Sequence, residues 1–71
     1  MKDKVKLLDV VALIDDVPNH KLMRGQVGTV VEILAPDIYE VEFSDNDGHT
    51  YAELAVKEEK LLILHYEPTP A

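Results

Sequence analysis

Apolar and polar residues alternate along most of this chain with a period of two, the pattern of β-strands that bury one face. The clearest case is the segment 38–44, in which Tyr39, Val41 and Phe43 alternate with polar residues. Together with the turn residues between segments, this alternation predicts strands over residues 7–14, 26–34, 38–44, 50–56 and 61–64. The first of these is apolar at most of its positions, as a strand buried on both faces would be.

The connections between the predicted strands differ in length. Residues 35–37 and 45–48 are rich in Pro, Asn, Asp and Gly, which favour tight turns. The segment 57–60 suits a single helical turn. Residues 15–24 form a loop of roughly ten residues, long enough to carry function. Residues 67–71 are expected to be a disordered tail.

This order of elements predicts an all-β protein. A strand, a long loop, three strands in a meander, a helical turn and a last strand are the chain order of an SH3-like small barrel of about five antiparallel strands. Closing such a sheet buries one face and leaves few open edges. With 71 residues in total, we expect one domain over residues 1–66. The alternative fold is an open antiparallel sheet that completes its core by dimerising.

Composition restricts the partners of such a domain. Seven Lys and Arg against fourteen Asp and Glu give a formal net charge of −7. Binding to nucleic acid needs clustered cations, which this acidic chain lacks. The longest apolar run, residues 10–14, is too short for a signal peptide or a membrane span. With no export signal and no cysteine, we expect a cytoplasmic protein that binds neither nucleic acid nor membranes.

The residues with chemical potential form no recognisable catalytic, cofactor or metal site. The three histidines lie in different predicted elements without the spacing of metal ligands. Ser44 is the only serine, and no nucleophile motif surrounds it. Residues 45–48 resemble part of a calcium-binding loop, but Phe43 and Leu54 occupy positions where further oxygen ligands are needed. We therefore predict a hairpin turn there, no cofactor, no metal and no enzymatic activity.

The most informative group of residues is acidic. In the predicted strand register Glu40 faces Glu53, Glu42 faces Tyr51, and Glu32 lies beside Glu40. Like charges opposed in a sheet repel each other. One interpretation is a solvated face that keeps the domain soluble. The other is a docking surface for a cationic protein, with Tyr51 as an aromatic anchor.

Residues 24–33, RGQVGTVVEI, carry a family resemblance together with residues 6–13 and 39–43. The chain resembles the bacterial family called domain of unknown function 4926, over residues 6–64. The resemblance implies an SH3-like barrel without an established activity, beside another small gene as in toxin–antitoxin pairs. The segment 24–33 is also similar to KOW segments and to the β-subunit barrel of nitrile hydratase. RNA-binding KOW domains display basic loops, whereas this chain displays acidic residues.

The sequence thus predicts a non-catalytic protein-interaction module, in one version the acidic, antitoxin-like member of a two-gene pair. The alternative is a small accessory subunit of an enzyme or electron-transfer complex. We expect a basic protein partner at the acidic face. The cationic stretch of Lys21, Met23 and Arg24 supports a second hypothesis, in which copies of the chain associate with one another.

Overall fold

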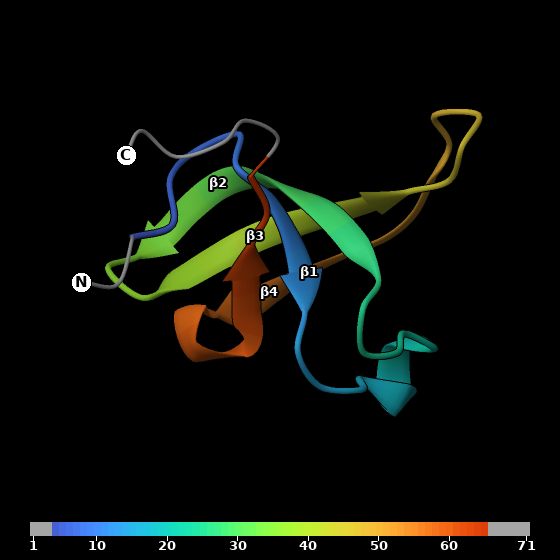
Figure 1. The fold of residues 1–71 in the computed structure, drawn as a ribbon, viewed down its shortest axis with the longest axis horizontal. Coiled ribbons are helices and arrows are strands. Elements are labelled where there is room, and N and C mark those ends of the chain that lie inside the picture. Colours follow the sequence, from blue (N-terminus) through green and yellow to red (C-terminus); the bar gives the residue numbers. More distant parts are fainter. Residues whose placement is uncertain (1–3, 66–71) are drawn as a thin grey trace.

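The computed structural model describes residues 4–65, which form five strands and two short 3-10 helices (Figure 1). The strands are β1 (Val10–Leu13), β2 (Val27–Ala35), β3 (Ile38–Ser44), β4 (Thr50–Lys57) and β5 (Leu61–Ile63). The 3-10 helices are η1 (Pro18–His20) and η2 (Glu58–Lys60). All five strands belong to one antiparallel sheet in the order β4-β3-β2-β1-β5. The all-β class, the five antiparallel strands and the helical turn before the last strand are confirmed.

Strand β2 connects the two halves of the sheet. Its first residues pair with β1, and the rest of the strand pairs with β3. Figure 1 shows β1 and β5 crossing the direction of the long β3 and β4 strands. At Gly28 the two halves approach closely, because an added Cβ would lie 2.7 Å from Cγ1 of Val41 and 2.9 Å from the carbonyl oxygen of Glu42. Only glycine fits at this position.

The core lies on the inner side of this folded sheet. Its largest fully buried side chains come from β1, β2 and β3, and are Tyr39, Phe43, Leu13, Val11, Val30 and Val41. The alternation predicted for β3 is confirmed, since Tyr39, Val41 and Phe43 are at most 1% exposed. Val56 and Leu61 add side chains from β4 and β5 to the same cluster.

The first strand is shorter than predicted, because residues 7–9 belong to a turn. The backbone N–H of Asp9 donates to the carbonyl of Lys6 (3.0 Å), and the Asp9 carboxylate accepts from the N–H of Lys6 (2.7 Å). Leu8 takes the left-handed conformation, with φ +70°. An aspartate that bonds nearby backbone in this way stabilises a turn in place of a strand.

The long loop after β1 is confirmed as a connection, although it is more ordered than an open loop. Val17 and Leu22 form an isolated bridge around η1, and Leu22 reaches the core. The carboxylate of Asp16 accepts a hydrogen bond from the backbone of Arg24 (2.8 Å). The predicted tail over residues 67–71 lies outside the described residues. Within residues 4–65 we find no helix with the length and apolar character needed to cross a membrane.

The β3–β4 hairpin closes with a different loop from the one predicted. The backbone N–H of Asp45 donates to the carbonyl of His49 (2.9 Å), so the loop holds residues 46–48 only. Gly48 closes it with φ +83°, as expected for a three-residue hairpin loop. This shifts the pairing by one residue from the prediction.

A β-bulge at Tyr51 shifts the pairing by one more residue. Beyond the bulge Glu42 lies opposite Glu53, whereas the prediction put Tyr51 there. Glu40 lies opposite Ala55 and not, as predicted, opposite Glu53. The predicted register is therefore wrong by two residues, a shift that keeps the glutamates on the outer side because side chains alternate with a period of two.

A buried hydroxyl ties three distant segments together at one end of the core. The Tyr39 hydroxyl lies 3.2 Å from the carbonyl oxygen of Pro36 and 3.2 Å from Oε1 of Glu58. The same Oε1 accepts from the backbone N–H of Val5 (3.2 Å). Burial of the ring and the neighbouring Glu58 raise the pKa of Tyr39. The β2–β3 turn, η2 and the N-terminal segment thus meet at a single phenol.

Replacing Tyr39 by phenylalanine is expected to lower the free energy of unfolding by about 1–2 kcal/mol, because a charged acceptor in a partly buried position loses a donor. Chemical denaturation of both proteins measures the difference. Tyr51→Phe is the matched control, since its hydroxyl accepts from Gln26 at an exposed position and its loss should cost less than about 0.5 kcal/mol. Equal losses for the two variants would contradict the role given to Tyr39.

Replacing Gly28 by alanine is expected to destabilise the fold by roughly 1–3 kcal/mol, because the new methyl group meets backbone as well as side-chain atoms of β3. Thr29→Ala, a change at the outward-facing neighbour, should cost less than about 1 kcal/mol. Thermal unfolding distinguishes them. If Gly28→Ala unfolds at the wild-type temperature, the two halves of the sheet are not in close contact there.

Candidate functional site

Four glutamates gather on the outer side of the sheet, which faces away from the core. They are Glu32 on β2, Glu40 and Glu42 on β3, and Glu53 on β4, and we call them the acidic cluster. Glu32 lies opposite Glu40, as predicted, and Glu42 lies opposite Glu53. Because Tyr39, Val41 and Phe43 point inward, Glu40 and Glu42 point to the outer side, where both are half-buried.

The central member of the acidic cluster is Glu40. Its pKa is raised above the ordinary value, first by a hydrogen bond with Glu53, then by partial desolvation and by the negative charges of Glu53 and Glu32. The three carboxyl groups predicted to lie together are thus close in space, although Glu53 reaches Glu40 diagonally and not from the directly opposed position. Negative charge accumulates here at neutral pH.

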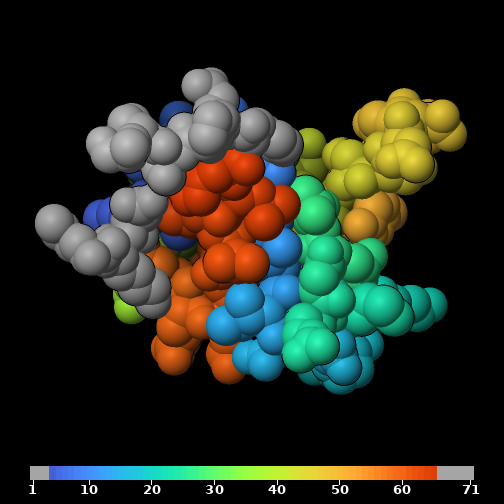
Figure 2. Space-filling view, viewed as in Figure 1, coloured from blue at the N-terminus to red at the C-terminus, as the bar shows by residue number. Residues whose placement is uncertain are grey.

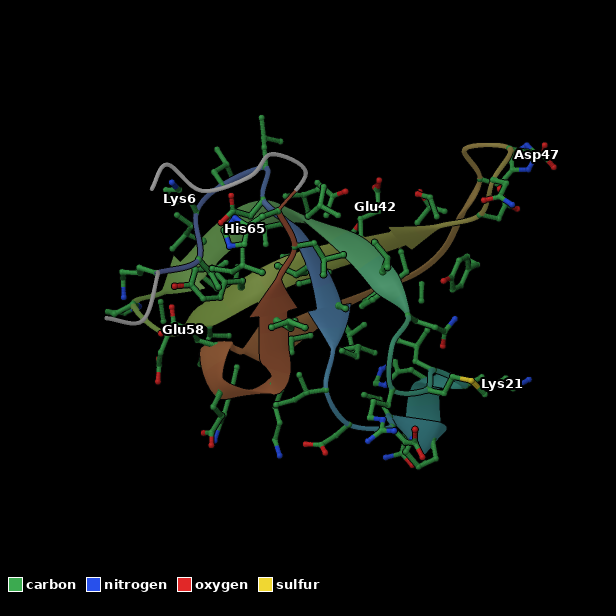
Figure 3. All side chains as sticks on the ribbon, in the orientation of Figure 1. Lys6, Lys21, Glu42, Asp47, Glu58 and His65 are labelled. Carbon is green, nitrogen blue, oxygen red and sulfur yellow. The ribbon has the colours of Figure 1, made fainter. Side chains whose placement is uncertain are left out.

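Within the described part of the chain, no ion pair links a cation to the acidic cluster. Among residues 4–65 the two ion pairs join Lys60 to Asp15 (2.9 Å) and His49 to Asp45 (3.7 Å), and neither involves these glutamates. Figure 3 shows Glu42 projecting outward near the crossing of β2 and β3, well apart from the labelled hairpin tip. The carboxylates are therefore available to positive groups from outside the chain.

Tyr51 does not lie where the sequence placed it. The bulge removes it from the position opposite Glu42, and its ring centroid lies 6.5 Å from that of the core residue Phe43. Its hydroxyl accepts a hydrogen bond from Nε2 of Gln26 at the start of β2 (3.1 Å). Tyr51 is 49% exposed, and its ring lies beside Phe43 and not opposite a member of the acidic cluster.

Sequence analysis missed a feature of the same outer side, at the other end of the sheet. Val27, Ala12 and Leu62 lie opposite one another on β2, β1 and β5, and all three point away from the core. We call these three residues the apolar row. The apolar character of both faces of residues 7–14 is the signal for it, although the same pattern also predicts a strand buried on both faces.

Other groups with chemical potential lie apart from this side of the sheet. Asp45, Asp47 and His49 have ligand atoms within 4.8 Å of one another, all exposed at the hairpin tip. Oδ1 of Asp45 already accepts from the backbone N–H groups of Asp47 and His49 (2.9 Å each). This arrangement stabilises the turn, the structural role predicted for the segment.

The cationic stretch of the long loop is exposed, as predicted. Met23 and Arg24 line a shallow hollow of about 520 Å³ together with residues 14–16. The backbone N–H of Met23 donates to Oε1 of Gln26 (2.6 Å), which holds the loop against the start of β2. Asp15 and Asp16 share this hollow, so the loop presents mixed charge and not a cationic surface.

Comparison with known proteins gives one positive result. The model of the family described as "Domain of unknown function (DUF4926)" matches residues 7–63. The match contains every strand and every member of the acidic cluster. No curated protein and no solved structure matches the chain.

Replacing Glu40 by glutamine is expected to raise the melting temperature at neutral pH, because the amide keeps a hydrogen-bond donor toward Glu53 without adding charge. Folding raises the pKa of Glu40 above its ordinary value of 4.5, so the folded protein holds this proton more tightly than the unfolded chain. The wild type therefore loses stability as the pH rises through that raised pKa. The advantage of Glu40→Gln should shrink as the pH falls and vanish below about 4.5.

Thermal unfolding of both proteins across this pH range measures the effect. Glu59→Gln is the control, since Glu59 is exposed on η2 outside the acidic cluster and undergoes the same chemical change. A gain for Glu40→Gln that is equally large at low and at neutral pH would contradict repulsion as its cause.

Proposed function

Because the chain belongs to the DUF4926 family, whose description names no activity, we propose its function from its own surface. The protein is a non-catalytic interaction module that binds a cationic protein through the acidic cluster of Glu32, Glu40, Glu42 and Glu53. The observation that carries this proposal is the crowding of Glu40 by the carboxylates of Glu53 and Glu32, none of which forms an ion pair within residues 4–65. Lysine or arginine side chains of a partner would relieve that repulsion on binding.

The charge of the whole chain supports the same partner. A net charge of −7 on 71 residues attracts a basic protein over long range, which raises the rate of association at low salt. The acidic cluster then gives this attraction a defined place, since its members project from adjacent strands of a rigid sheet. The competing interpretation, a solvated surface that only maintains solubility, requires charge but no particular position for it.

The test must therefore distinguish the effect of where the glutamates lie from the effect of the net charge. The chain is tagged and purified from its native host at low salt, as the wild type and as the double variant Glu40→Gln/Glu53→Gln. A second double variant, Asp47→Asn/Glu59→Gln, removes the same two charges from exposed sites outside the acidic cluster. We expect a basic protein to elute in stoichiometric amount with the wild type and the second variant, and to be lost from the first.

Two results would contradict the proposal. One is equal loss of the partner from both double variants, which would mean that net charge alone matters. The other is a chain that elutes alone at low salt in all three forms. The identity of a retained partner decides whether the module acts in an antitoxin-like pair.

A further inference from the structure

The apolar row is a second surface feature of residues 4–65, and two of its three side chains are exposed. Leu62 is 55% exposed and Val27 45%, while the smaller Ala12 between them is 7% exposed and forms the floor of the row. Figure 2 shows the segments around β5, β1 and the start of β2 side by side on the viewed face. Exposed apolar side chains that adjoin one another mark interaction surfaces more often than isolated ones do.

The apolar row is continuous with the acidic cluster. Next to it along the strands Val10 lies opposite Thr29, Thr29 lies opposite Glu42, and Glu42 lies opposite Glu53. Val10, Thr29, Glu42 and Glu53 thus form a second row across four adjacent strands, with an apolar side chain at one end and acidic ones at the other. This row adjoins the apolar row, because Ala12 and Val10 share the outer side of β1. Neighbouring strands are about 4.8 Å apart, so Glu42 lies roughly 10 Å from Val10. One outer surface thus changes from apolar to acidic at Thr29.

Charge decides what occupies this surface. A second copy of the chain would bring another net charge of −7 against the first, beside carboxylates that already repel each other. A partner with lysine or arginine next to its apolar side chains satisfies both halves of the surface at once. Apolar contact supplies affinity, and opposite charge fixes the register of the contact.

We propose that one protein segment covers the whole surface, with its apolar side chains on Val27 and Leu62 and its lysine or arginine side chains on Glu42 and Glu53. This rests on the proposed function and narrows its partner class from basic proteins in general to basic segments with adjoining apolar residues. A merely cationic chain without such residues binds more weakly.

Labelled synthetic peptides of equal length test this directly by fluorescence anisotropy with the purified chain. The first peptide carries four lysines and four leucines with glycine spacers. In the second the leucines are replaced by serines, and in the third the lysines are replaced by glutamates. We expect the first to bind with a dissociation constant about tenfold lower than that of the second, as burial of about one leucine side chain would give, and the third to bind weakest.

Variants of the chain show which residues cause the preference for the leucine peptide. Leu62→Ser should abolish most of the tenfold preference for the leucine peptide. Ile33→Ser is the matched control, because Ile33 is 52% exposed and lies roughly 20 Å along β2 from Val27. Glu42→Gln/Glu53→Gln should weaken the two lysine peptides by similar factors and make their binding less sensitive to salt.

The outcomes separate this inference from the proposed function. Equal affinity for the leucine and serine peptides overturns the inference and leaves a purely charge-based site. Failure of both lysine peptides to bind overturns the proposed function as well. If the leucine peptides with lysine and with glutamate bind equally well, charge does not contribute to binding, and both the inference and the proposed function are overturned. A wild-type dimer in sedimentation that Leu62→Ser converts to a monomer makes the second copy the occupant and also overturns the inference.

Discussion

Burial of one face of β3 is the interaction on which the rest of the structure depends. Tyr39, Val41 and Phe43 are at most 1% exposed and are packed with side chains from every other strand. A strand whose alternate residues are fixed inside has no freedom to turn its remaining residues anywhere but outward. The core therefore determines the positions of Glu40 and Glu42. Their repulsion destabilises the fold, and burial of the inward side chains offsets this cost.

The same constraint explains how a small chain tolerates so much local repulsion. A domain of this size has a stability of only a few kcal/mol, so four clustered glutamates are a measurable cost. The neighbouring Glu53 and Glu32 raise the pKa of Glu40, so protonation of Glu40 lowers this cost. The Tyr39 hydroxyl and Glu58 meanwhile join three segments at one end of the core, where Nζ of Lys4 also donates to the carbonyl oxygen of Pro36 (3.0 Å). The repulsion lies on the outer side, where water screens it, and not within this network.

Much of this arrangement could be predicted from the sequence, and the errors have local causes. The period of two located β3 with its observed bounds and placed the glutamates outside. The register of β4 failed because it depended on a loop of 46–48 and on a bulge at Tyr51, and no alternation pattern encodes either. A shift of two residues still preserved the faces, so the glutamates lie on the outer side as predicted, whereas the predicted pairs Glu40–Glu53 and Glu42–Tyr51 do not form.

The apolar row was missed for a different reason. An apolar residue on each face of a short strand is typical of burial on both sides, but residues 4–65 of this chain form a single sheet. Within the described residues the two halves of the sheet cover its inner side, and no second layer covers its outer side. The outer side is apolar over β1 and β5 and acidic over β3 and β4. Water solvates its apolar part poorly, a second acidic copy would be repelled by its glutamates, and a purely cationic polymer would leave its apolar part without contacts. The proposed partner combines both properties: its positive charges would orient its approach, and its apolar side chains would slow its dissociation.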